Sequence, residues 1–181
     1  MGFQTTILDR QAYGNVGEFF DDSPRRVETA ILESADPADN VFGRVFTRIG
    51  QTTDCPAQIV EAGGTGVFVG FLIGPKEHAS YGTVGDALAP SLTLPNYVNA
   101  ALCNMGVIYV KLPAVANVGD LVLYAEADGA LSTILPGAAL PVGQQFAHAV
   151  VDQFQVADVD PNDSEYLAVI RITDVATAPA P

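Results

Sequence analysis

The sequence predicts an all-β protein, a single β-sandwich or barrel-like domain that carries an extended N-terminal arm. Short runs rich in β-branched and aromatic residues recur along the chain, with turn residues between them. No stretch has the sustained periodicity of a long amphipathic helix, and 181 residues is a length typical of one domain. We predict an arm at residues 1–24, the β domain at residues 25–175 and a flexible tail at residues 176–181.

The predicted arm alternates glycines, aromatic residues and acidic residues without a regular period, and it ends in Ser23-Pro24. If fully extended, it would reach up to about 80 Å, which is more than a connector inside one domain needs. Aromatic side chains gain nothing by staying in solvent, so we expect them to be buried either on their own domain or on a neighbouring subunit. These residues are Phe3, Tyr13, Phe19 and Phe20.

Two strands are predicted after the arm, at Val27–Leu32 and Val41–Ile49, with a turn at residues 36–40 between them. Alternation in the second strand separates its side chains into two sets. One set is Phe42, Arg44, Phe46 and Arg48, and the other is Val41, Gly43, Val45, Thr47 and Ile49. The aliphatic set is the expected core face, which leaves an exposed row of phenylalanines and arginines. This row could be solvated decoration or a contact surface for another subunit, because both residue types are enriched at interface hot spots.

The apolar run of residues 67–74 predicts a strand buried on both faces, and residues 75–99 predict a long loop. The clearest signal comes from residues 107–134. Two runs there, Val107–Leu112 and Leu121–Glu126, are rich in β-branched and aromatic residues, and Asp128-Gly129 predicts a hairpin turn before residues 130–134. Two further strands are predicted at residues 146–154 and 166–172.

The charge of the chain restricts its partners. The formal net charge is −13, from 21 acidic and 8 basic residues, and this argues against a nucleic-acid partner, which requires clustered lysine and arginine. The N-terminus lacks the pattern of a signal peptide, and no apolar run reaches the length of a membrane span. We therefore expect synthesis in the cytoplasm and no membrane partner.

Residues that could carry chemistry are few. His78 and His148 are the only candidate general bases near neutral pH, and neither stands in a recognisable catalytic pattern, so we predict that the protein is not an enzyme and needs no cofactor. Cys55 and Cys103 match no metal or redox spacing. Two buried free thiols are the favoured interpretation, with a disulfide as the alternative.

One acidic stretch partly fits a calcium loop. Asp158, Asp160 and Asn162 supply alternating oxygen ligands. However, Asp163 occupies the position of the required glycine, and Val169 occupies that of the bidentate glutamate. We predict a polar turn without a metal ion, with these three residues as a weak candidate site.

Several segments together resemble the structural cement, or head decoration, proteins of tailed bacteriophages. They lie between Met1 and about Leu131, and their order makes the resemblance fairly specific. The segments are MGFQ, GNVGEFFDDSPRR, NVFGRVFT, GVFVGFLIGPKEHASYG, LAPSLTLPN, GVIYVKL and GDLVLYAEADGAL. The resemblance brings no catalytic motif with it.

The resemblance implies a virion protein with a β fold, made in the host cytoplasm, that binds the outer surface of the capsid and bridges subunits of the major capsid protein. It also implies a homo-oligomer, such as a trimer. The candidate contact residues are Phe3, Tyr13, Phe19, Phe20, Arg25, Arg26, Phe42, Arg44, Phe46 and Arg48, with the arginines meeting carboxylates on a neighbour. The alternative is a receptor- or glycan-binding module displayed on the virion, which would use Tyr81 and Tyr97 of the long loop.

Overall fold

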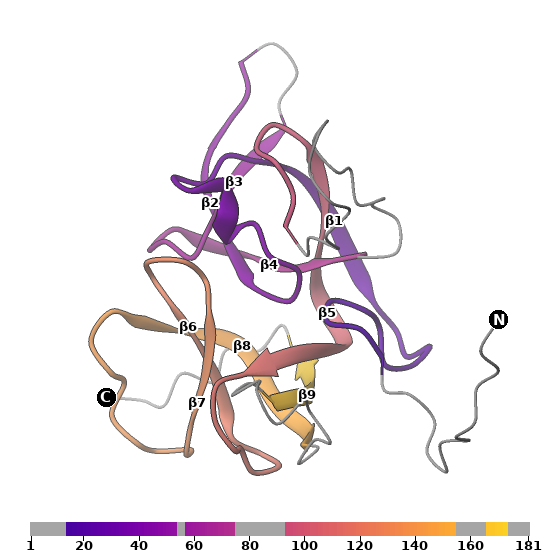
Figure 1. Ribbon diagram of the computed structural model, residues 1–181, viewed down its shortest axis with the longest axis vertical. Coiled ribbons are helices and arrows are strands. Elements are labelled where there is room, and N and C mark those ends of the chain that lie inside the picture. Colours follow the sequence, from indigo (N-terminus) through magenta and orange to yellow (C-terminus); the bar gives the residue numbers. More distant parts are fainter. Residues whose placement is uncertain (1–13, 54–56, 75–92, 155–165, 174–181) are drawn as a thin grey trace, which may run out of the picture.

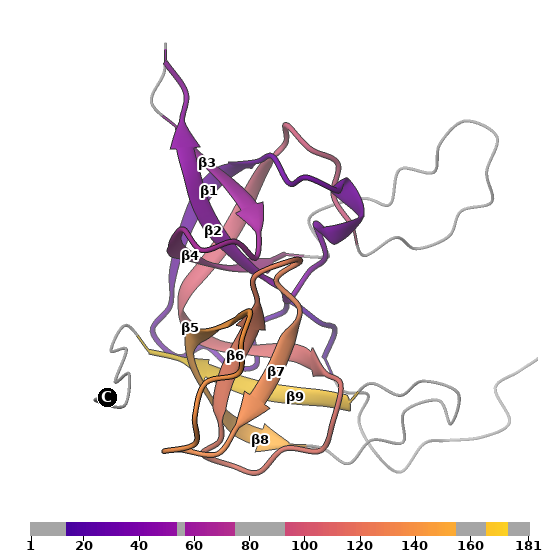
Figure 2. The ribbon, with the colours of Figure 1, turned by 90° about the vertical axis from the view of Figure 1, so that its left-hand side faces the viewer.

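The protein folds into two β lobes that share one long strand (Figures 1 and 2). The computed structural model describes residues 14–53, 57–74, 93–154 and 166–173. Those residues contain nine strands and a single 3₁₀ turn, η1 (Pro37–Asp39), which confirms the all-β prediction. The strands are β1 (Arg26–Leu32), β2 (Val45–Gln51), β3 (Gln58–Ala62), β4 (Val67–Ile73), β5 (Asn99–Leu112), β6 (Leu121–Ala125), β7 (Leu131–Ile134), β8 (Gln144–Phe154) and β9 (Tyr166–Ile172).

The first lobe is a closed five-stranded barrel. Its strands pair in the order β1-β3-β2-β4-β5, and β5 pairs with β1 again, which closes the ring. The β1–β3 pair is parallel, and the other four pairs are antiparallel. Closure gives every barrel strand two neighbours, so the hydrogen-bonding groups that an open sheet exposes at its edge are paired.

The second lobe is an antiparallel sheet in the order β5-β9-β8-β6-β7. Strand β5 belongs to both lobes, because residues 99–105 pair with β1 and β4 while residues 106–112 pair with β9. Gly106 lies at the change of partner and has a φ of 145°, a value that favours glycine. A glycine here therefore allows one strand to serve two sheets.

Two buried clusters fill the lobes and the junction between them. The cluster inside the barrel includes Phe46 and Leu72. The second cluster lies between the barrel wall and the second sheet, and it includes Val45 and Phe71. Adjacent residues of β2 and β4 thus enter different clusters, so residues 45–47 of β2 and residues 69–73 of β4 are buried on two faces. This confirms the prediction of a two-sided buried run for residues 69–73, whereas Val67 at the start of β4 is 67% exposed.

The prediction that phenylalanines and arginines of residues 42–48 form an exposed row is wrong. Phe42 is 3% exposed and Phe46 is 0% exposed, and both lie in the barrel cluster. The burial results from tertiary packing. One side of the strand faces the barrel interior, and the second sheet covers the other side. The pairing of β2 with β4 shifts register between Phe46 and Thr47, where Val69 of β4 is the extra residue. Arg48 lies at the surface although Phe46, two residues earlier on the same strand, is buried.

Strand β9 and the β6–β7 hairpin occur where they were predicted. Residues 126–129 form the turn between Ala125, whose N–H donates, and Ala130, whose carbonyl accepts. Gly129 adopts the positive φ of 71° that its Asp-Gly signal indicated. Strand β3 and residues 99–106 of β5 were not predicted as strands from the sequence. The missed part of β5 is rich in alanine and asparagine, which carry little strand propensity, so its pairing partners determine its conformation.

The described part of the predicted arm packs on its own chain. The Gly17 and Phe20 N–H groups donate to the carbonyls of Tyr109 and Val107, both at 2.9 Å, and Glu18 accepts from the Tyr109 N–H. Phe19 is half-buried against the second cluster, and Phe20 makes an edge-to-face contact with Tyr109. For Phe19 and Phe20, then, the structure shows contacts with their own domain. Phe3 and Tyr13 lie outside the described residues, and the division at residue 24 stays a prediction.

Candidate partner-binding surface

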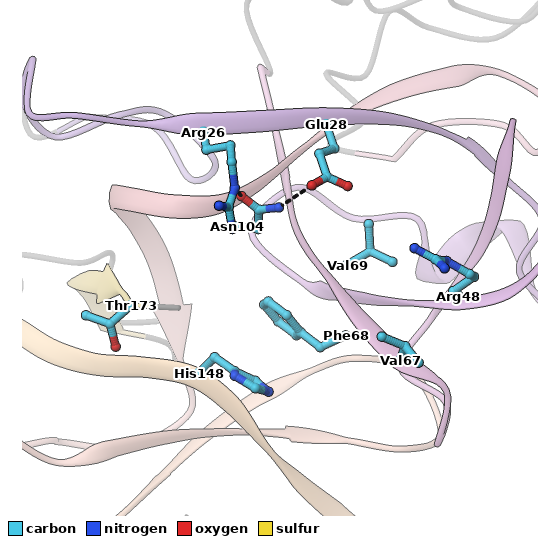
Figure 3. A pocket seen from close by; sticks show the side chains of 9 residues that line it. All are labelled: Arg26, Glu28, Arg48, Val67, Phe68, Val69, Asn104, His148 and Thr173. Atoms are coloured by element: carbon cyan, nitrogen blue, oxygen red, sulfur yellow. Dashed lines mark hydrogen bonds between the residues drawn. The ribbon is translucent and has the colours of Figure 1, made fainter. Parts of the chain in front are cut away.

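A cleft of about 250 Å³ opens where the barrel meets the second sheet (Figure 3). Strands β1, β2, β4, β5 and β8 all contribute side chains to it, together with one residue that follows β9. The lining residues are Arg26, Glu28, Arg48, Val67, Phe68, Val69, Asn104, His148 and Thr173. The cleft thus brings Arg26 and Arg48, two of the predicted contact residues, to one place on the surface.

A chain of hydrogen bonds holds the two arginines beside the cleft. The Arg26 Nε donates to Asn104 Oδ1 at 2.7 Å, and Asn104 Nδ2 donates to Glu28 Oε1 at 2.8 Å. Gln58 Nε2 donates to the other oxygen of Glu28 at 3.1 Å. Arg48 Nε and Nη2 both donate to Gln58 Oε1, at 3.0 and 2.7 Å. Glu28 therefore receives bonds from two neutral amides, and each guanidinium donates to an amide oxygen.

The charge of this cleft differs from that of the whole chain. Its lining carries two guanidinium groups and one carboxylate, while the chain has a formal net charge of −13. Arg26 and Arg48 are both exposed, so their side chains can be reached from solvent. A local excess of positive charge in an acidic protein favours binding of a carboxylate.

The apolar side of the cleft is formed by stacked rings. The Phe68 and His148 rings are 4.8 Å apart and 25° from parallel, and Phe68 also contacts Phe71 edge to face. His148 has a φ of 52°, unusual for a residue other than glycine, and its carbonyl accepts a bond from the Thr173 N–H at 2.9 Å. This histidine is packed as part of the junction between the lobes. His78 lies outside the described residues.

The other two predicted arginines also make contacts within the chain. Arg44 forms ion pairs with Asp39 at 3.0 Å and Asp128 at 3.4 Å, and it donates to the Asp128 carbonyl. Its carboxylate partners thus belong to its own domain, where they join the barrel to the β6–β7 hairpin. The Arg25 guanidinium lies 4.4 Å from the centre of the Phe19 ring, a cation–π contact at the start of β1.

Sequence reasoning did not find the residues that position Arg26 and Arg48. Gln58 lies in the missed strand β3, and Asn104 lies in the missed part of β5. Asn104 is 78 residues from Arg26, and no local pattern connects them. Tyr97 of the alternative glycan-binding hypothesis is 74% exposed, and Tyr81 lies outside the described ranges.

The weak metal candidate, Asp158, Asp160 and Asn162, also lies outside the described residues. Within residues 14–53, 57–74, 93–154 and 166–173, no group of three or more His, Cys, Asp and Glu side chains is placed to hold a metal ion. The same ranges contain no helix of the length and apolarity needed to cross a membrane.

Cys103 is a buried free thiol, and Cys55 lies outside the described part of the chain. The Cys103 Sγ donates to the Met105 carbonyl, and burial raises the pKa of the thiol to about 11. The folded protein therefore holds this proton more tightly than the unfolded chain does. The contribution of this group to stability is present below pH 9 and is lost as the pH rises from about 9 to about 11.

The raised pKa predicts that the Cys103 thiol reacts slowly in the folded protein. In a Cys55→Ser variant, Cys103 is expected to react with Ellman's reagent at pH 8 about a hundredfold more slowly in the folded protein than in urea, because two pKa units remove about 99% of the thiolate. The absorbance of the released thiolate gives both rates. Equal rates in the two states would contradict the burial and the raised pKa.

Comparison with known proteins identifies the class. The family model described as "Structural cement protein (E217 gp24/Pam3 gp6)" matches residues 3–173, nearly the whole chain. The chain therefore belongs to this family of phage structural proteins, and its role is to stabilise a capsid. This agrees with the resemblance found in the sequence segments.

A solved structure shows the same fold. A chain of "The capsid of Myoviridae Phage XM1" matches with a TM-score of 0.58 and 17% sequence identity, and the match covers 96% of this chain and 99% of that chain. No curated protein sequence matches this chain. At this level of identity the structural match supports the architecture, while the family match supports the role.

Proposed function

We propose that this cement protein binds the outer surface of the mature capsid and bridges neighbouring subunits of the major capsid protein, without catalysing a reaction. The observation that carries the proposal is the family match over residues 3–173. The acidic character of the chain agrees with a position outside the shell, away from the packaged nucleic acid. Synthesis in the host cytoplasm and assembly as a homo-oligomer belong to the same proposal.

Binding would stabilise the shell by mass action. A protein that binds the expanded lattice and not its precursor or its dissociated subunits lowers the free energy of that lattice alone. Each bridge links subunits that would otherwise separate independently, and many identical bridges add their effects over the shell. Modest affinity per copy is therefore sufficient for a large gain in capsid stability.

The cleft supplies the contact chemistry. We expect a carboxylate of the major capsid protein to lie between Arg26 and Arg48, because a guanidinium binds a carboxylate through two parallel hydrogen bonds. The amide network already holds both side chains, so less conformational entropy is lost on binding. The remaining proposed contacts are Phe3, Tyr13, Phe19, Phe20 and Arg25. Phe42 and Phe46 are buried and are not among them.

Co-sedimentation of the purified protein with expanded capsids that lack it tests the proposal, with the melting temperature of the capsid as a second readout. Saturable binding together with a raised melting temperature is the expected result. Absence of binding would contradict the cement role at the outer surface.

The same assay tests the cleft. The Arg26→Gln, Arg48→Gln double variant is expected to bind capsids at least about tenfold more weakly, because it removes both partners of the proposed carboxylate. Binding by the unchanged protein should also weaken with added salt. Arg171→Gln is the matched control: this arginine pairs with Asp152 and lies outside the cleft lining, so its replacement should change binding less than twofold. Equal affinities of the double variant and the control would exclude the cleft as the contact.

A further inference from the structure

The second lobe carries an exposed surface that contains no charged residue. It consists of two loops, residues 113–119 before β6 and residues 135–143 between β7 and β8, and we call it the uncharged loop surface. All nine residues of the second loop are exposed. Five of the nine large apolar side chains that are exposed in the described residues lie in these two loops, namely Val115, Val118, Leu135, Leu140 and Val142. Val142 and Val118 are the most accessible, with exposures of 104% and 71%.

Strand register brings the two loops together. Leu121 pairs with Ile134, so Val118 and Leu135 lie at the same end of the β6–β7 hairpin. The second loop then extends to the other end of the hairpin, where the Gly143 carbonyl accepts a bond from the Glu126 N–H at 2.9 Å. The uncharged loop surface therefore runs the length of the hairpin on the lobe formed by β6–β9 (Figure 1).

Prolines, glycines and a hydrogen bond constrain the backbone of the second loop although it is exposed. Pro136 and Pro141 restrict the backbone, and the Ala138 N–H donates to the Leu135 carbonyl at 3.1 Å. Gly137 and Gly143 adopt positive φ values of 86° and 76°, which complete its turns. A loop ordered in this way presents its apolar side chains without a large entropic cost on binding.

The net negative charge of the chain favours a second copy of the same chain as the partner of this surface. Each copy of the chain carries a formal charge of −13, so two copies repel each other wherever their acidic surfaces meet. A patch that contacts the same chain must avoid placing like charges opposite each other, and an uncharged apolar patch meets this requirement. A contact with a different protein carries no such requirement, because opposite charges can be matched there, as at the arginine cleft.

We propose that the uncharged loop surface is the contact through which copies of this protein associate with one another. The proposal rests on the homo-oligomer of the proposed function and assigns a surface of its own to that self-association. Self-association then uses the apolar loops of the second lobe, while the arginine cleft stays available for carboxylates of the shell.

Salt dependence distinguishes this contact from an ionic one. Association between like-charged copies through an apolar patch becomes tighter as salt screens their repulsion, whereas association through arginine and carboxylate groups becomes weaker. Sedimentation of the full-length protein over a concentration series, at 0.15 M and about 1 M salt, measures this sign. We expect an oligomer that is stabilised by the added salt. A monomer at all concentrations, or an oligomer that dissociates as salt rises, would overturn the proposal.

Two single substitutions provide the second test. Val142→Glu and Leu135→Glu each place a negative charge on the uncharged loop surface, and each is expected to raise the concentration for half-assembly at least about tenfold. Because both side chains are largely exposed, the melting temperature of the monomer should not change. Ile49→Glu on the barrel, at a side chain that is 48% exposed, is the matched control and should assemble as the unchanged protein does. Assembly that withstands both loop substitutions would overturn the assignment.

Capsid co-sedimentation of the same variants separates this proposal from the cement role. A Val142→Glu variant that is monomeric but still binds capsids leaves the outer-surface role intact and supports separate surfaces. Failure of the unchanged protein to bind capsids contradicts the cement proposal and leaves the sedimentation result to decide self-association by itself.

Discussion

Replacement of Phe46 by alanine is expected to lower the free energy of unfolding by about 3–5 kcal/mol, which is a large part of the stability of an ordinary domain. The ring is completely buried inside the barrel, where it packs in the same cluster as Leu72 and Leu102. Its removal leaves a cavity that strands closed into a ring cannot easily collapse. Urea unfolding followed by circular dichroism measures the loss.

Ile49→Ala in the same strand is the control for Phe46→Ala. Its side chain is 48% exposed, so the expected loss is below about 1 kcal/mol. The comparison decides between a core phenylalanine and the exposed row that strict alternation predicted. Similar small losses for both variants would contradict the burial of Phe46.

Gly129→Ala is expected to destabilise the protein by about 2–5 kcal/mol. The residue has a φ of 71°, which costs a residue with a side chain about 1–2 kcal/mol. A Cβ atom here would also overlap the Val45 carbonyl and lie 2.8 Å from the Gly63 nitrogen, so the hairpin would have to move away from the barrel. That movement would strain the hydrogen bond from the Val45 N–H to the Gly129 carbonyl, which joins the lobes.

Gly143→Ala isolates the effect of this close approach. Gly143 has a similar φ of 76°, but a Cβ atom added to it meets nothing within 4 Å. It should therefore lose only the conformational part, about 1–2 kcal/mol. The difference between the two variants in thermal or urea unfolding measures the contact between the lobes, and equal losses would contradict a tight junction.

The arginine cleft could be predicted only in part. Composition indicated that scarce arginines in an acidic chain are candidates for contact with carboxylates, and Arg26 and Arg48 are indeed exposed beside one cleft. Arg44 has the same chemistry, yet it binds Asp39 and Asp128 of its own chain. Sequence could not separate these cases, because only the fold brings Asn104, Gln58 and Asp128 to the arginines.

The exposure of the apolar loops could not be predicted from the sequence either. Val118 and Val142 lie between predicted strands, and only the fold shows that both side chains are in solvent. Conversely, Phe42 and Phe46 alternate with arginines as surface residues do, and the interior of the closed barrel buries them.

The sequence by itself determined which segments become strands where the signal is local: β-branched and aromatic runs at β1, β4, β6 and β9, and the Asp-Gly turn at Gly129. Local propensity acts within a few residues, so these features can be recognised without the fold. Only the tertiary structure decided that β5 serves two sheets, that the first three residues of β2 are buried on both faces and which groups the arginines contact. Those outcomes depend on pairing and packing between residues far apart in the chain, and the free energy of such contacts exceeds the local preferences that a sequence displays.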